Sequence, residues 1–308
     1  QTAAFVLRKS RIEDYKSYNV RLVDFYDSRR YEKEEQFFNP NNRYFSVKQS
    51  DYKKITGSPL AYWASENIFK LFENKPISAF AETKKGMFTG NNDLFLKYWY
   101  EVSQDKFNMN YKFYNKGGGY RKWYGNIENV IFWANGGHKV KNYNGSGNIN
   151  EKYFYKECIT WGLICTENFS ARYLPRGFVI GDAGPICIPP KEIEVYLGYL
   201  NSNLTKFCLS LLNPTLNFSS GVIANLPMPY IKYDKKQQII DLVIQNVNIS
   251  KRDWDDFETS IDYKKHPLVF YNQQNINKLS DSFINWTNFT ERQFKKLKQN
   301  EEMLNIII

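Results

Sequence analysis

The sequence predicts an α+β protein in which a β-rich domain is followed by a helical C-terminal region. Three observations predict this class. Short apolar runs separated by glycine- and proline-containing turns occupy residues 76–192. After residue 192, apolar residues recur every three or four positions, which is the helical period. The chain has 308 residues, of which 42% are hydrophobic and 24% charged, so it can form a packed core.

The first 75 residues are predicted to form a connector without a large core of their own. Apolar and polar residues alternate in short runs in this region, and residues 21–25 are predicted to form a strand. Residues 31–38 are predicted to form a helix that stops before Pro40. Pro59 is expected to open a second helix that reaches Glu73, because proline suits the first helical turn.

Residues 76–232 are predicted to be the β-rich domain. Residues 77–81 and 130–133 are expected to be strands, and glycines at 117–119, 125, 136–137 and 145–147 mark turns. Residues 193–212 carry the helical period throughout, which predicts one largely buried helix. The segment 218–226 is expected to return as a short strand.

Residues 233–308 are predicted to be helical. One helix begins near Asp234, and a last helix begins near Thr290, where Thr290-Glu291-Arg292-Gln293 supplies a capping pattern. Three isoleucines at 306–308 follow with no stop signal. Either this tail packs into the chain's own core, or the sequence is a piece of a longer protein, and both readings remain open.

The charge of the chain points to a polyanionic partner. Lys and Arg number 42 against 32 Asp and Glu, a formal net charge of +10. Residues 106–150 hold seven of these cations against the single acid Glu128, interleaved with aromatic residues. Cations neutralise phosphates and aromatic rings stack on bases, so we expect this segment to contact double-stranded DNA. The alternative is a solvated, basic β-hairpin with cross-strand aromatic pairs.

A second candidate segment, residues 168–181, contains Arg172 and Arg176 on either side of Pro175. Arginine on a rigid turn can read guanine, although its stem can equally pack over apolar neighbours. The predicted phosphate contacts are Lys116, Arg121, Lys122, Lys139 and Lys141. Predicted base or sugar contacts are Trp123, Tyr124, Arg172 and Arg176, and Tyr120 completes the candidate DNA-binding set.

Several kinds of site are not supported by the sequence. The four cysteines have no CxxC spacing, and we expect them to be buried apolar residues. The loop 84–92 lacks the Gly-Lys-Ser/Thr of a P-loop, and no Asn/Asp-Pro-Pro-Tyr/Phe tetrapeptide of amino-group methylation is present. Glu82-Thr83-Lys84 matches only the end of a nuclease signature. No catalytic, cofactor or metal residue is therefore assigned, no membrane-spanning run is found, and an intracellular, cytoplasmic setting is expected.

Four blocks of the sequence resemble a known family. They comprise residues 85–92, residues 115–126, residues 169–177, and the set 197–202, 212–218 and 226–229. Together they resemble the C-terminal half of the BREX phage-defence adenine-specific DNA methyltransferases of the PglX-like type, and residues 249–267 are similar too. The first and last blocks also resemble, more loosely, the target-recognition domains of TaqI-like methyltransferases and type IIG restriction enzymes.

This resemblance implies a specificity region rather than a catalytic one. In such families an N-terminal Rossmann-like domain, absent from this sequence, binds S-adenosylmethionine and methylates a flipped adenine. The part seen here would then grip the duplex and read the site, with residues 1–75 as the exit from that domain. Two other readings remain: a scaffold that docks other defence subunits, and an independent metal-dependent nuclease that uses Glu82.

Overall fold

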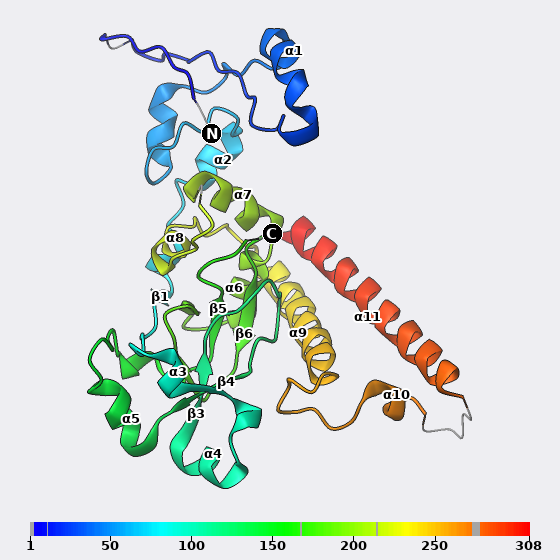
Figure 1. Cartoon of the computed structure of the whole chain (residues 1–308). Helices are drawn as coiled ribbons and strands as arrows, with labels where there is room; N and C mark the ends of the chain where they lie inside the picture. The colour runs from blue at the N-terminus through cyan, green and yellow to red at the C-terminus, as the bar shows by residue number, and fades with distance from the viewer. Residues whose placement is uncertain (1–2, 11, 167, 214, 273–277) are drawn as a thin grey trace. The chain divides into compact units, whose positions relative to one another are not determined.

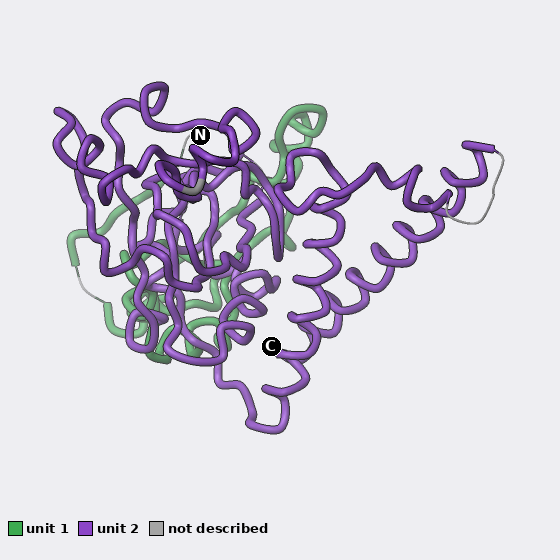
Figure 2. The backbone as a smooth tube through the Cα atoms, turned by 90° about the horizontal axis from the view of Figure 1, so that it is seen from below, with its two compact units in different colours: residues 1–76 green, residues 77–308 purple. Residues whose placement is uncertain are grey.

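The computed structural model describes residues 3–10, 12–166, 168–213, 215–272 and 278–308 (Figure 1). The chain divides into two compact units, residues 1–76 and residues 77–308, which Figure 2 colours separately. Helices and two four-stranded sheets make the protein α+β, as predicted. The sheets and the long C-terminal helices lie in the same unit.

The described residues of the first unit form four short helical segments and two isolated antiparallel bridges, Lys16 with Lys48 and Asn19 with Tyr44. The helical segments are η1 (Asp27–Glu32), α1 (Lys33–Phe38), η2 (Gln49–Lys54) and α2 (Glu66–Leu71). The helix predicted over 31–38 is confirmed. The strand predicted over 21–25 is wrong, because Arg21 bonds to Asp24 across a turn. The helix predicted from Pro59 begins only after Ser65.

One sheet of the second unit is antiparallel throughout. Its order is β1 (Glu82–Lys84), β8 (Ile186–Ile188), β5 (Cys158–Trp161) and β6 (Ala171–Leu174). The other sheet is mixed, in the order β2 (Leu96–Tyr98), β4 (Asn129–Phe132), β3 (Tyr111–Asn115) and β7 (Phe178–Ile180). Strands β3 and β7 are parallel, and the other neighbours in this sheet are antiparallel.

Two predicted strands are helical instead. Residues 77–81 begin as the 3-10 turn η3 (Ile77–Ala79), in which fully buried Ile77 donates its backbone N–H to Leu226. Residues 218–226 contain α8 (Ser220–Ala224), because the Ser219 side chain caps its first turn. The strand predicted at 130–133 is confirmed as β4. Short elements connect the strands: α3 (Asn92–Phe95), η4 (Trp99–Glu101), α4 (Gln104–Asn110), α5 (Ala134–Lys141) and η5 (Glu151–Tyr153).

The helix predicted over 193–212 is interrupted. It forms α6 (Ile193–Leu200) and α7 (Asn203–Leu212), and the Ser202 hydroxyl accepts from the Thr205 N–H to start the second helix. The helix predicted from Asp234 is confirmed as α9 (Tyr233–Asp255). The short α10 (Pro267–Phe270) precedes α11 (Leu279–Ile307), which begins well before Thr290. The Thr290 hydroxyl donates to Thr287 inside this helix rather than capping its start.

The core of the second unit lies between the two sheets and under α9. Its cluster includes Ile131, Trp133, Val179, Ile186 and Trp254. The prediction for the cysteines is confirmed, since all four are free and buried. Burial raises the pKa of the Cys187 and Cys208 thiols to about 12.

At the C-terminal end of α11 the isoleucines are partly packed. Leu304 is buried and Ile308 lies beside Gly198 of α6, whereas Ile306 is 77% exposed. Among the described helices, long ones such as α9 and α11 included, none combines the length and apolar character needed to cross a membrane.

Candidate functional site

The loop that joins β3 to β4, residues 116–128, holds six of the ten predicted DNA contacts. Its second half runs beside β6 as an irregular strand. The Trp123 N–H donates to Ala171 O (3.0 Å), and the Tyr173 N–H donates to Trp123 O (2.8 Å). The glycine run at 117–119 lets the chain turn first, because Gly117 and Gly118 have φ of +80° and +109°. The loop is therefore fixed along the sheet rather than free.

Arg172 lies beneath this loop and is 1% exposed. Its Nη2 donates to Gly117 O (3.0 Å), and its Nη1 donates to Gly119 O (3.4 Å) and Arg121 O (3.3 Å). Burial lowers the pKa of Arg172 to about 10, so the guanidinium stays charged at neutral pH. The base contact predicted for Arg172 stays a prediction, and the structure shows this side chain buried with three donated bonds to the loop above it.

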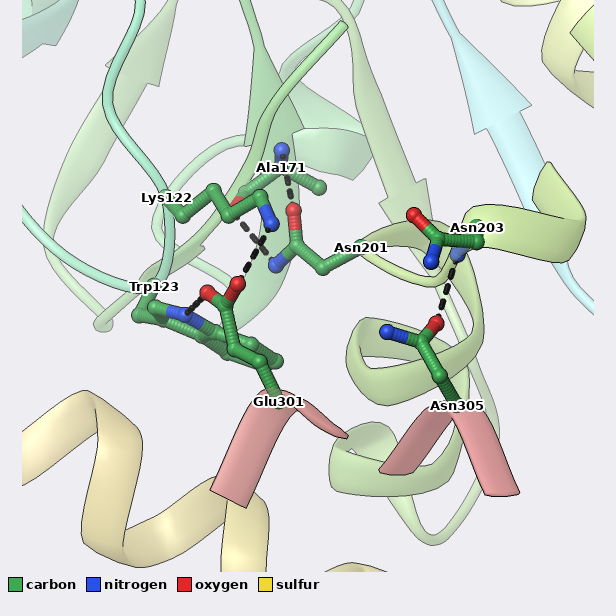
Figure 3. Close-up of polar contacts among 7 residues, drawn as sticks. All are labelled: Lys122, Trp123, Ala171, Asn201, Asn203, Glu301 and Asn305. Carbon is green, nitrogen blue, oxygen red and sulfur yellow. Dashed lines mark hydrogen bonds and ion pairs between the residues drawn. The ribbon is translucent and has the colours of Figure 1, made fainter. Parts of the chain in front are cut away.

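Trp123 and Tyr124 are also buried, at 1% and 8% exposure, and their role as base or sugar contacts stays a prediction. The Trp123 Nε1 donates to Glu301 of α11 (2.8 Å). The same carboxylate accepts from Lys122 Nζ (2.9 Å), as Figure 3 shows. The aromatic part of the loop is thus a docking surface for α11, and a sequence pattern does not distinguish this role from stacking on bases.

Three of the predicted phosphate contacts form ion pairs within the protein. Lys122 pairs with Glu301, and Arg121 pairs with Asp253 of α9 (2.5 Å) and lies over the Trp254 ring. Lys141 pairs with Glu151. A phosphate would have to displace these carboxylates. Their counterparts Asp253 and Glu301 lie more than a hundred positions away in the sequence.

The four remaining predicted residues are exposed and have no acidic partner among the described residues. They are Lys116, Tyr120, Lys139 and Arg176. Lys116 and Tyr120 belong to the glycine-rich turn. Lys139 and Arg176 lie elsewhere, at the end of the sheets where β3 begins.

Strand register places Arg176 beside further cations. Phe113 of β3 pairs with Phe178 of β7 in parallel, so continuing that register places Arg176 level with Tyr111 at the start of β3, one position from Lys112. Cys158 pairs with Leu174 in antiparallel β5 and β6, so continuing that register places Lys156 opposite Arg176. Hydrogen bonds between Tyr155 and the 177–178 backbone hold these segments together.

Helices α4 and α5 add two more cations at this end, where Figure 1 labels both helices beside β3. The Trp133 N–H donates to Asn110 O, which ties the start of α5 to the end of α4. Lys139 Nζ lies 5.4 Å from the centre of the Phe132 ring, and that ring packs on Tyr111. We call this group the basic end: Lys106, Lys112, Lys139, Lys156 and Arg176.

The basic end carries a net positive charge. All five side chains are exposed, and none forms an ion pair with a described residue. Two carboxylates lie beside them in sequence: Asp105 bonds with Ser103 at the start of α4, and Glu157 accepts from the Tyr173 hydroxyl. Neither forms an ion pair with a described cation, and five cations outnumber them. Such a surface can neutralise phosphates without first breaking internal ion pairs.

Sequence reasoning did not choose Lys106, Lys112 and Lys156. The first two lie in the basic stretch but carry no local feature that separates them from the paired cations. Lys156 lies outside that stretch, and only strand pairing brings it to Arg176. In the described part of the chain, no cluster of three or more His, Cys, Asp or Glu is placed to hold a metal ion. Glu82, the residue of the nuclease reading, pairs with Lys152.

Comparison with known proteins gives two relatives that cover the whole chain, while no protein-family model matches it. The adenine-specific methyltransferase PglX of Lacticaseibacillus casei (strain Zhang) is 34% identical over 337 residues, and the match covers 28% of that protein. The adenine-specific methyltransferase BrxX of Escherichia coli O9:H4 (strain HS) is 33% identical over 319 residues, covering 25%. The chain thus spans about a quarter of the length of these relatives.

A solved structure is similar as well. It is the type IIL restriction-modification enzyme MmeI in complex with DNA, with a TM-score of 0.47 and 11% sequence identity. The match covers 76% of this chain and 33% of that one.

Proposed function

The chain is related over its whole length to the PglX-like adenine-specific methyltransferases, as its sequence predicted, and from this premise we propose that it binds double-stranded DNA. In this proposal it is the target-recognition region of an S-adenosylmethionine-dependent adenine-N6 methyltransferase of a phage-defence system. The cofactor and the methyl transfer belong to another part of the protein. The observation that carries the proposal is the basic end.

The physical argument rests on counterion release. Each phosphate that a lysine or arginine neutralises releases condensed cations. The logarithm of the binding constant therefore falls linearly with the logarithm of the salt concentration, and each phosphate contact contributes about −0.9 to this slope. The basic end offers five such side chains, drawn from strand β3, helices α4 and α5, and the loops that precede β5 and β7. The Phe132 ring packs on Tyr111 and holds Lys139, whose Nζ lies 5.4 Å from the ring centre.

The test neutralises the basic end without touching the core. We expect the triple variant Lys112→Gln, Lys139→Gln, Arg176→Gln to bind a 30-base-pair duplex much more weakly. The slope of the logarithm of its binding constant against the logarithm of the salt concentration (the salt slope) should become less steep by about two to three, since up to three phosphate contacts are lost. Fluorescence anisotropy at several salt concentrations measures both quantities.

A matched control removes the same charge elsewhere. Lys206, Lys235 and Lys296 are exposed on α7, α9 and α11 and form no ion pair with a described residue. The triple glutamine variant of these lysines should keep the wild-type salt slope. If both triple variants lose the same duplex affinity, the effect comes from the net charge of the chain and not from the basic end. A wild-type chain that binds no duplex would refute the proposal.

A further expectation concerns catalysis. We expect the chain alone to bind no S-adenosylmethionine in calorimetry and to transfer no methyl group to a duplex. A measurable heat of S-adenosylmethionine binding would contradict the proposal that the cofactor binds another part of the protein.

Protein docking is a second candidate function, favoured by one observation. Large apolar side chains of α10 and α11 are exposed, among them Val269, Phe283, Ile284 and Phe294. Capture of another defence subunit that withstands high salt, together with no duplex binding, would favour this reading over the first.

A further inference from the structure

The glycine-rich turn at 116–120 has unused hydrogen-bond donors. The backbone N–H groups of Gly118, Gly119 and Tyr120 donate to no atom of the described residues. The flanking donors are occupied, since the Gly117 N–H faces the Asn115 side chain and the Arg121 N–H donates to the Ser170 hydroxyl. Three successive free donors therefore lie on an exposed turn.

The carbonyls of the same turn are tied inward by Arg172, which holds the oxygens of Gly117, Gly119 and Arg121. This arginine has no carboxylate partner among the described residues, and its Nε has no hydrogen-bond partner there. A buried charge without a counter-ion is costly. Here backbone carbonyls alone compensate it, and the nearby charge of Arg121 opposes it.

We propose that the turn Lys116–Tyr120 is an anion-binding loop that holds one phosphate of the DNA backbone. The free N–H groups of Gly118, Gly119 and Tyr120 donate to the phosphate oxygens, and exposed Lys116 supplies a counter-charge. Arg172 is a positioning residue: it fixes the carbonyls inward and adds positive potential from below. The inference deepens the proposed function and rests on it.

The anion-binding loop and the basic end are close enough to bind the same DNA duplex. Lys112 and Lys116 stand four residues apart at the two ends of β3, roughly 13 Å along an extended strand. One helical turn of DNA spans about 34 Å. Both contacts therefore fit within half a turn of the same helix.

The glycines of the turn are not equivalent, and this provides the test. A Cβ at Gly117 would lie 2.2 Å from Ala183 O, and Gly118 has φ +109°. Gly119 has no such φ, and no atom of the described residues lies within 4 Å of where its Cβ would be. A side chain at position 119 leaves the fold intact but stands in the space from which a phosphate would approach.

The experiment measures two signals on the full chain. In spectra of protein labelled with ¹⁵N-glycine, inorganic phosphate should shift the Gly118 and Gly119 resonances more than that of exposed Gly136. In duplex titrations, Gly119→Val and Lys116→Gln should each lower the salt slope by about one, whereas Lys206→Gln should leave it unchanged. Thermal unfolding of Gly119→Val should match that of the wild type.

Arg172 is tested by comparing two variants. Arg172→Lys retains the charge and should keep the phosphate-induced shifts, whereas Arg172→Gln should lose them. If Arg172→Gln does not fold, Gly119→Val decides. Two results would overturn the proposal of an anion-binding loop. One is a Gly119→Val variant with the salt slope of the wild type, and the other is that phosphate does not shift the Gly118 and Gly119 resonances.

The outcomes separate this inference from the proposed function. A basic-end triple variant that loses duplex binding while Gly119→Val retains it would refute the loop alone. Phosphate-induced shifts in a chain that binds no duplex would refute DNA binding and leave an anion site without its proposed ligand.

Discussion

Glu301 shows at the residue scale how a distant carboxylate changes the role of a motif. Lys122 and Trp123 form part of a basic and aromatic run that favours DNA contact. Both donate instead to Glu301, 178 and more positions further along the chain. The fold therefore gives Lys122 and Trp123 a partner within the protein that the composition of the run does not reveal.

We predict that Glu301→Ala lowers the free energy of unfolding by about 1–3 kcal/mol, because the buried Trp123 indole N–H loses its acceptor. Glu301→Gln keeps an oxygen acceptor and should cost less. Urea unfolding followed by tryptophan fluorescence measures the change.

The neighbouring residue Glu302 provides the control. Its side chain is 62% exposed and its contact with Lys298 is a long surface pair of 3.9 Å. Glu302→Ala should change stability by less than about 0.5 kcal/mol. Equal costs for the two alanine variants would show that the Trp123 bond contributes nothing particular.

At the scale of elements, the pairing of α9 with α11 decides where the C-terminal helix lies (Figure 1). Buried Asn300 of α11 donates to Asn246 Oδ1 of α9 (2.9 Å). At the far end of α11, Asn305 accepts from the Asn203 N–H and so caps α7 (Figure 3). Polar bonds thus fix the position of α11 against two other helices.

We predict that Asn246 and Asn300 are energetically coupled. In a double-mutant cycle with alanine at each position, the interaction energy should be about 0.5–3 kcal/mol, because the two side chains share one buried hydrogen bond. Chemical denaturation of the four proteins gives this value.

A parallel cycle pairs Asn246→Ala with Gln299→Ala, an exposed position on α11. Its coupling should stay within about 0.5 kcal/mol. Coupling in the second cycle as large as in the first would show that the helix pair responds as a whole and not through this bond.

At the scale of the whole molecule, the sheets and the C-terminal helices are held together by side-chain bonds. Arg121 pairs with Asp253, Lys122 with Glu301, and the Trp99 indole donates to Thr259 O (2.8 Å). The second compact unit, residues 77–308, includes both partners of each bond.

We predict that residues 77–308 produced alone keep the duplex affinity and salt slope of the full chain, because the basic end and its core lie inside this unit. Residues 77–232 alone should not fold stably, because Arg121, Lys122 and Trp123 would lose their partners. Circular dichroism melts and anisotropy titrations test both fragments. A cooperative melt of the shorter fragment at the temperature of the longer one would contradict this.

The sequence by itself determined the α+β class, a helix beginning near Asp234, a strand at 130–133, the buried cysteines and the resemblance to a methyltransferase family. These follow from local periodicity, from side-chain polarity and from similarity along the chain. Tertiary structure alone decided which cations are free. Arg121, Lys122 and Arg172 are occupied by groups that folding brings to them, whereas strand pairing brings Lys156 opposite Arg176 and places both near the start of β3. Electrostatic pairing depends on distance in space, and a linear pattern of charges does not contain that distance.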